Sequence, residues 1–134
     1  RRYGRRLTLG MAEIDGFKKA NDDFSHATGD AVLREIACLI QDHISEIDLV
    51  GRYGGEKFAL AFPGTDPANA ARLADRVRKL VARHDWTHVA PKLMVTLSIG
   101  LAGNAGVASI EEQFGLADAK LYEAKTNGRD RVAV

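Results

Sequence analysis

The chain contains a single cysteine among its 134 residues, so no disulfide can form within it. Cys38 stands among the apolar residues of a predicted helix, and we predict that it is a small buried hydrophobic residue. No apolar run approaches the length of a membrane span, and no signal peptide precedes the first predicted strand. These absences predict a reducing, cytoplasmic location without membrane insertion of this segment. The domain could still be tethered to a membrane or to a sensor domain through another part of the protein.

An excess of one sign of charge is also lacking. Nineteen lysine and arginine residues face eighteen aspartate and glutamate residues, which argues against a dedicated nucleic-acid binder. Repeats, linkers and low-complexity segments are absent, and the length suits one domain with one core over residues 1–134. The abrupt start in a basic segment predicts that this domain is part of a longer protein.

What is present is an alternation of strand-like and helix-like segments. Residues 7–14 read as a buried strand that ends at Glu13 and Asp15, which alternation places on one face with Ile14 on the other. A turn and a short helix at 17–22 follow. As alternatives to a functional role, Asp15 caps that helix and Glu13 is a solvated strand end.

The next helices have recognisable start signals. We predict that His26 lies in a turn and that Asp30 is the N-cap of a helix with an apolar stripe from Val32 to Ile44. Asp66 followed by Pro67 marks a second helix start. A third helix is expected between a capping box at Ser109 and Glu112 and a C-cap at Asn127 and Gly128, with a stripe of Leu116, Ala119, Leu121 and Ala124.

A glycine turn between two short apolar runs organises the middle of the chain. Residues 49–50 and 59–62 read as a hairpin around Gly54 and Gly55, because glycine enters φ > 0 without steric cost. The turn presents Glu56 at an exposed tip, although a surface hairpin with a chance carboxylate has the same pattern. With strands at 93–102 and 131–134, the order βααββαβαβ predicts an α+β fold, in which a central, mostly antiparallel five-stranded sheet is flanked by helices.

Several motifs, in order, resemble the GGDEF family of bacterial diguanylate cyclases. They are the segments 13–22 (EIDGFKKAND), 25–30 (SHATGD), 54–58 (GGEKF), 98–100 (SIG), 117–125 (ADAKLYEAK) and 127–130 (NGRD). The likeness covers about residues 7–132. It implies a nucleotidyl-cyclase palm related to the ferredoxin-like fold. It also implies that a homodimer condenses two GTP into cyclic di-GMP plus two pyrophosphates, and that an upstream sensory domain controls this reaction. The family's Asp-x-Leu-Thr-Gly-Leu-x-Asn-Arg segment is missing upstream.

The resemblance also implies roles for individual residues. Glu13, Glu56 and the Ile14 carbonyl would bind Mg²⁺ or Mn²⁺, with Glu56 as the base and Lys18 as the second catalytic residue. Asn21 and Asp30 would read guanine. The remaining substrate contacts, besides Lys18, would come from Gly16, Phe17, His26, Gly54, Gly55, Lys125 and Arg129. We place Lys125 and Arg129 one turn apart on the last helix, where both reach one phosphate.

Three departures from the family pattern leave two functions open. Glu13 replaces the usual aspartate and Lys57 replaces an acid, and both are expected to lower activity. The inhibitory Arg-x-x-Asp site is degenerate, because Ser45 replaces the arginine three residues before Asp48. The leading prediction is an active cyclase, and the alternative is a degenerate domain that binds GTP or cyclic di-GMP without turnover and signals through partners. A ferredoxin-like interaction module without nucleotide is the third interpretation.

Overall fold

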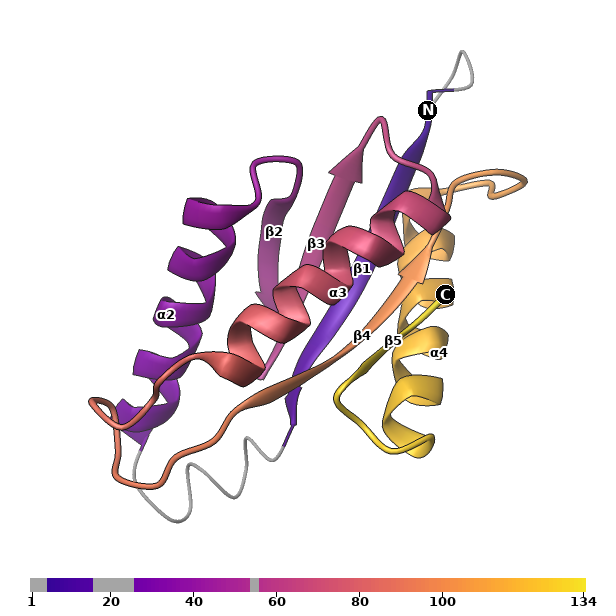
Figure 1. Ribbon diagram of the computed structural model, residues 1–134. Helices are drawn as coiled ribbons and strands as arrows, with labels where there is room; N and C mark the ends of the chain where they lie inside the picture. The colour runs from indigo at the N-terminus through magenta and orange to yellow at the C-terminus, as the bar shows by residue number, and fades with distance from the viewer. Residues whose placement is uncertain (1–4, 16–25, 54–55) are drawn as a thin grey trace.

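The computed structural model describes residues 5–15, 26–53 and 56–134, with the backbone alone of His26. The described elements are drawn in Figure 1. In chain order they are β1 (Leu7–Asp15), α2 (His26–His43), β2 (Asp48–Tyr53), β3 (Lys57–Pro63), α3 (Pro67–Arg83), β4 (Thr96–Ala102), α4 (Ile110–Thr126) and β5 (Arg131–Ala133). The helix predicted at 17–22 lies outside the described residues.

The five strands form one sheet in the order β2-β3-β1-β4-β5. Three of the four strand pairs are antiparallel, and only β4 and β5 run parallel. The hairpin of β2 and β3 closes with Tyr53 opposite Lys57. The predicted α+β fold with a mostly antiparallel five-stranded sheet is confirmed.

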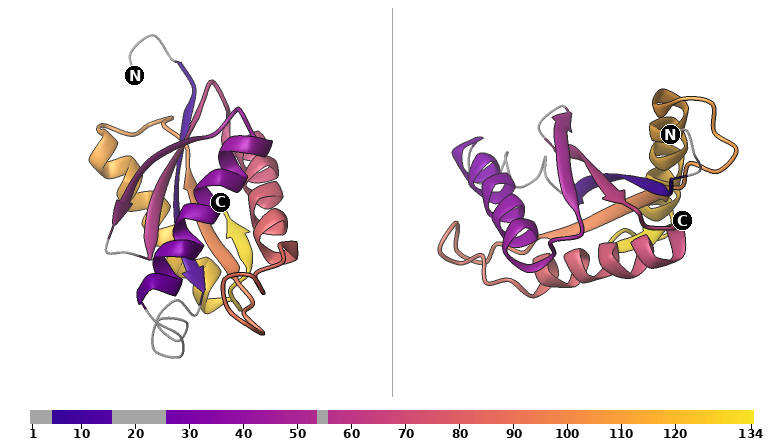
Figure 2. Two further views of the ribbon diagram at one scale, coloured as in Figure 1. Left: turned by 90° about the vertical axis from the view of Figure 1, so that its left-hand side faces the viewer. Right: turned by 90° about the horizontal axis from the view of Figure 1, so that it is seen from above.

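The helices cover both faces of the sheet, with α3 in front and α4 behind in Figure 1 and the layers seen edge-on in Figure 2. Alternation along β1 divides its side chains between the two faces. Ala12 and Ile14 join the larger core with residues of α2 and α3, whereas Met11 packs under α4 with Ala117 and Leu121. No helix in the described part of the chain is long and apolar enough to cross a membrane.

Helix α4 approaches the sheet unusually closely at Gly100 in β4. A Cβ atom built on Gly100 would lie 2.1 Å from the Leu121 nitrogen and 2.3 Å from the Ala117 oxygen. Both are backbone atoms of α4 and cannot rotate away, so only glycine fits at this position. The buried side chain of Gln113 adds a polar tie, donating from Nε2 to the carbonyls of Leu7 (2.7 Å) and Ala102 (3.0 Å).

The predicted helix starts of α3 and α4 are confirmed. Asp66 caps α3 by accepting the Asn69 N–H (2.9 Å), and Pro67 is the first helical residue. Ser109 accepts the Glu112 N–H (3.1 Å). The Glu112 carboxylate in turn accepts the Ala108 N–H (3.0 Å), one residue earlier than in the standard capping box.

The predicted start of α2 is wrong. The helix begins at His26, so Asp30 is an exposed residue within it and not its N-cap. Gly29, which suggested a break, is buried. It stands three and four residues before Val32 and Leu33, so it belongs to the buried face of the helix, where a residue without a side chain is accommodated.

Two predictions about burial and one about a strand boundary also need correction. Cys38 is exposed, because successive helical residues rotate by about 100° and it lies nearly opposite Ile36 and Ile40. On α4, Leu116 is 46% exposed and Ala119 is exposed as well, because the buried stripe consists of Gln113, Ala117, Leu121 and Ala124. Strand β4 begins at Thr96 rather than at residue 93.

Substituting Gly100→Ala should lower the free energy of unfolding by about 3 kcal/mol, because the new methyl group overlaps the α4 backbone. Denaturant unfolding measures this change. Gly115→Ala, within α4, is the matched control. No neighbouring atom of the described residues lies within 4 Å of its added Cβ, so this substitution should stabilise the chain by about 0.5–1 kcal/mol. Equal stabilities of the two variants would contradict the close packing of α4 on β4.

Candidate functional site

The candidate site forms where β1 ends, and its first member is Glu13. This side chain points to the α4 face, where Lys125 Nζ lies 2.7 Å from Glu13 Oε1. The Glu13 side chain is only 14% exposed. The interpretation of Glu13 as a solvated strand end is therefore wrong, because its carboxylate is covered and paired with an ammonium group.

The β2–β3 hairpin reaches this end of β1 through its backbone. The Ile14 N–H donates a hydrogen bond to the Glu56 carbonyl (3.1 Å), just beyond the ladder in which Glu13 stands opposite Lys57. The Glu56 residue is half-buried. Two segments that are far apart in the sequence therefore bring two glutamates to neighbouring backbone positions.

Lys57 is paired with a residue of α4. Its ammonium group lies 2.9 Å from Asp118 Oδ1, and both side chains are partly exposed. Lys57 shares the α4 face with Glu13, since directly opposite residues of an antiparallel pair project to the same side. The positive charge of Lys57, which replaces an acid of the family pattern, is thus balanced by Asp118.

Asp15 is bound to β4 and to the segment before β5. Its Oδ1 accepts from Ser98 Oγ (2.7 Å), and its Oδ2 accepts from Thr96 Oγ1 (2.8 Å) and from the Asp130 N–H (3.0 Å). One carboxylate therefore links the ends of three strands. Our reading of the sequence missed this role, although alternation does place Asp15 on the side of Thr96 and Ser98.

The turn after α4 carries Arg129 and is unusually shaped. Its φ angles are +125° at Gly128, +64° at Arg129 and +47° at Asp130. The Arg129 N–H donates to the Ala124 carbonyl (2.9 Å). Since α4 ends at Thr126, Arg129 is not one turn after Lys125 on the same helix, as predicted. It follows the helix in a left-handed turn, where aspartate at 130 is tolerated.

Arg78 of α3 holds this turn from the other side. It donates to Asp130 Oδ1 (2.9 Å) and to Asp75 Oδ1 (2.8 Å). Burial alone would lower the pKa of Arg78, but its hydrogen bonds to the Asp75 and Asp130 carboxylates, and their charges, outweigh burial and raise that pKa above its ordinary value. The Arg78 side chain is only 20% exposed.

The other predicted site residues are spread over the chain. Gly16, Phe17, Lys18, Asn21, Gly54 and Gly55 lie outside the described residues, and only the backbone of His26 is described. Asp30 is exposed on the second turn of α2. Ser45 and Asp48 are exposed beside the start of β2, at a different place on the sheet from Glu13.

The donors at the end of β1 suit a hard cation. Carboxylates of Glu13 and Glu56 and the carbonyl of Ile14 are oxygen ligands of the kind that Mg²⁺ prefers. Lys125 contacts one oxygen of Glu13 and thereby compensates its charge. The residue types at this position therefore fit a divalent metal with phosphate oxygens completing its shell.

Comparison with known proteins identifies the family. The model of the family "Diguanylate cyclase, GGDEF domain" matches residues 1–131. The chain belongs to the GGDEF domain family. The GGDEF resemblance of the sequence motifs is thereby confirmed.

Curated relatives resemble this GGDEF domain over nearly its whole length. The Response regulator PleD of Caulobacter vibrioides is 41% identical over 138 residues, which cover 96% of the chain and 30% of PleD. Diguanylate cyclase A of Treponema denticola is 39% identical over 129 residues, with 96% and 35% covered. The GGDEF domain thus spans about a third of the length of these relatives.

Solved structures share its fold. The active GGEEF domain of a diguanylate cyclase from Vibrio cholerae has a TM-score of 0.87 at 34% identity, covering 96% of this chain and 82% of that one. The GGDEF domain of DgcB from Caulobacter crescentus, in complex with c-di-GMP, has a TM-score of 0.85 at 32% identity, with 97% and 78% covered. The predicted fold type is confirmed.

Asp15→Asn should loosen the turn before β5. Both carboxylate oxygens of Asp15 accept hydrogen bonds, and asparagine would replace one of these oxygens with an NH₂ group that faces a donor. We expect the free energy of unfolding to fall by about 1–3 kcal/mol, measured by denaturant unfolding. Asp85→Asn is the control: Asp85 is exposed, and the hydrogen bonds described for its side chain are with Thr87 nearby, so its free energy of unfolding should stay close to the wild-type value. An unchanged Asp15→Asn variant would contradict the linking role of this carboxylate.

Proposed function

We propose that this GGDEF domain is a diguanylate cyclase, which condenses two GTP into cyclic di-GMP and two pyrophosphates. Two relatives that bear this name are 39% identical to the chain, and the active GGEEF domain of a diguanylate cyclase from Vibrio cholerae is 34% identical. The observation that carries the proposal is the meeting of Glu13, the Glu56 backbone and Lys125 at the end of β1. Acidic and basic groups gathered at one strand end are what a metal–triphosphate complex requires.

Glu13, Glu56 and the Ile14 carbonyl would hold Mg²⁺, or Mn²⁺ in its place. When bound, the cation spreads the charge of the triphosphate and lowers the pKa of the attacking hydroxyl. Glu13 is one methylene longer than the family's aspartate, so its carboxylate must fold back to the same position. Mg²⁺ demands near-octahedral geometry, and for this reason we expect Glu13 to slow the reaction.

Glu56 would act as the base in each half of the reaction. The 3′-hydroxyl of one GTP attacks the α-phosphorus of the other, its proton passes to Glu56, and the bond from the α-phosphorus to the bridging oxygen of the leaving pyrophosphate breaks. Lys18 would offset the charge that develops on the phosphoryl oxygens. The second condensation repeats these steps and closes the ring.

Lys125 and Arg129 would bind phosphate oxygens. In the free domain Lys125 is held on Glu13. With a divalent cation held by Glu13, the Lys125 ammonium would pair with oxygens of the triphosphate instead of with that carboxylate. The left-handed turn at Arg129, fixed by Asp15 and Arg78 through Asp130, would present the guanidinium at the same end of the sheet.

The remaining contacts would hold the nucleotide in place. Backbone N–H groups at Gly16, Phe17 and Lys18 would cradle the phosphates, with Gly54, Gly55 and His26 also lining the substrate. Asp30, helped by Asn21, would accept the N1–H and 2-amino groups of guanine. Adenine carries an acceptor at N1 and leaves this carboxylate unpaired, so ATP is expected to be a poor substitute.

Two domains must face each other, because each holds one GTP. We therefore propose a homodimer during catalysis, and a position as one domain of a longer cytoplasmic signalling protein with an upstream sensor. Product feedback would not use a phosphate clamp at Asp48, since Ser45 lacks the guanidinium that grips phosphate.

A domain that binds nucleotide without turnover is the second candidate, and Lys57 favours it. The ammonium stands where the family has an acid, opposite Glu13 in the sheet. Its pairing with Asp118 supports the cyclase instead, because a paired charge disturbs the neighbouring cation less than a free one does.

Glu56→Gln should abolish cyclic di-GMP formation, lowering the rate by about 100-fold or more through loss of the base. Chromatography of GTP incubated with the chain and Mg²⁺ or Mn²⁺ measures the product. Glu111→Gln, an exposed glutamate in the first turn of α4, is the control and should keep the wild-type rate. GTP binding without product in the wild type would favour the binding domain, and neither binding nor product would refute both candidates.

A further inference from the structure

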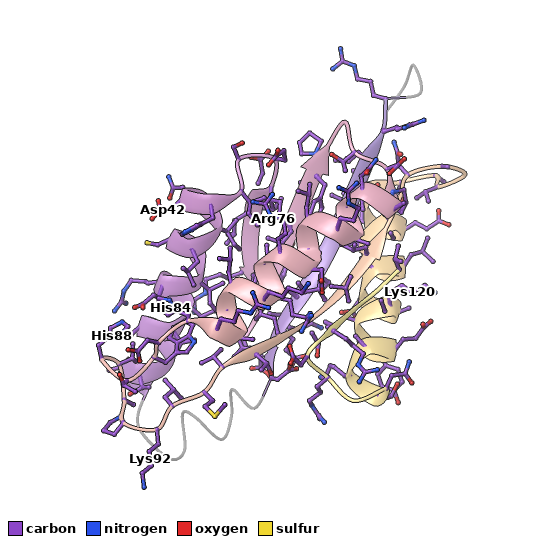
Figure 3. The ribbon with its side chains drawn as sticks, viewed as in Figure 1. Asp42, Arg76, His84, His88, Lys92 and Lys120 are labelled. Atoms are coloured by element: carbon purple, nitrogen blue, oxygen red, sulfur yellow. The ribbon has the colours of Figure 1, made fainter. Side chains whose placement is uncertain are left out.

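A cluster of metal-ligand side chains lies outside the candidate site. It consists of Glu35 on α2 with His84 and His88 in the segment between α3 and β4, where Figure 3 labels the two histidines beside α2. His88 Nε2 lies 2.6 Å from Glu35 Oε2, and His84 Nε2 contacts the same oxygen. The three ligand atoms lie within 4.8 Å of one another.

The segment that carries the histidines is held firmly. Trp86, between them in sequence, is buried and donates from Nε1 to the Val81 carbonyl (3.0 Å). The His84 ring packs edge-on against Trp86 with centroids 4.6 Å apart, and the Val89 and Ala90 N–H groups both donate to the Trp86 carbonyl. The imidazoles are therefore placed by a packed tryptophan and a hydrogen-bonded turn.

The charge of Glu35 suits a cation ligand. Burial acts to raise its pKa, but hydrogen bonds from His84 and His88 and their charges outweigh burial, and the pKa lies below its usual range. An ionised carboxylate only accepts hydrogen bonds, so each imidazole must turn an N–H toward it. Two protons converge on one oxygen, and a metal ion can replace both.

The geometry points to a binding site for a divalent transition cation of the Zn²⁺ class, with Glu35, His84 and His88 as its three protein ligands. Two histidines and one glutamate form a known zinc-ligand set, usually completed by water. His88 is 56% exposed, which leaves an open side for the ion and its water. Tetrahedral zinc separates its ligand atoms by about 3.3 Å, so the two histidine–glutamate contacts need to open by under about 1 Å to admit the ion.

Such an ion would join α2 to the segment after α3. Glu35 already contacts both histidines across this boundary in the described part of the chain. The site uses neither Glu13 nor Glu56, and it stands whether or not the domain is a cyclase.

The experiment titrates Zn²⁺ into the untagged, chelator-treated chain by calorimetry near neutral pH, with Co²⁺ as the spectroscopic probe. We expect one Zn²⁺ equivalent that depends on the cluster and a visible absorption band typical of four-coordinate Co²⁺. His88→Gln and His84→Gln should each weaken Zn²⁺ binding by more than about 100-fold, beyond the roughly 10–100-fold effect of losing an outer partner. Circular dichroism checks that each variant folds. If His84→Gln does not fold, His88→Gln still tests the site, because His88 is exposed.

Two control variants separate this site from other metal binding. His43→Gln changes an exposed histidine of α2 that bonds to the Leu39 carbonyl, and it should leave the Zn²⁺ affinity unchanged. Glu13→Gln should also leave it unchanged, so a failure of the zinc site is distinguishable from a failure of the proposed cyclase. No Zn²⁺ binding in the wild type, or equal binding by the His84 and His88 variants, would overturn the proposal.

Discussion

The seating of α4 on β4 is the constraint on which the rest of the site depends. Gly100 lets the backbone of α4 come within reach of the sheet, and no other residue fits there without moving Leu121 or Ala117. In this position α4 places Lys125 in contact with Glu13. It also delivers Asp118 to Lys57. A glycine in one strand therefore sets where the charged side chains of the facing helix fall.

Charged groups on both sides of the sheet serve to join elements that are distant in sequence. On the α4 side, Asp15 binds β4 and the turn at Asp130. On the other side, Glu35 connects α2 to the segment that carries His84 and His88. The partly exposed pairs of Glu35 with the two histidines contribute little to stability, so their effect lies mainly in fixing geometry. The arrangement suits the proposed nucleotide site, whose charged groups would be in place before the nucleotide binds.

Local signals in the sequence predicted the fold well, whereas contacts between distant segments were beyond them. Each helix-start signal lies within four residues of sequence, Asp66 with Pro67 in one case and Ser109 with Glu112 in the other. Both predicted helix starts are confirmed. The pairing of Glu35 with two histidines about fifty residues later depends on how α2 packs, which no local pattern contains. Arg129 was misplaced because the helix ends at Thr126 and a left-handed turn follows. The six family motifs indicated the family but not that geometry.

Amide hydrogen exchange followed by NMR tests most directly whether the end of α4 is held in place in the free domain. The Asp130 N–H, bonded to Asp15 Oδ2, and the Arg129 N–H, bonded to the Ala124 carbonyl, are the two reporters. We predict that both exchange at least about 100-fold more slowly than unstructured peptide, a protection of about 2.7 kcal/mol. Exchange of both amides at the rate of an unstructured peptide would contradict the account, because the turn would then form only with substrate.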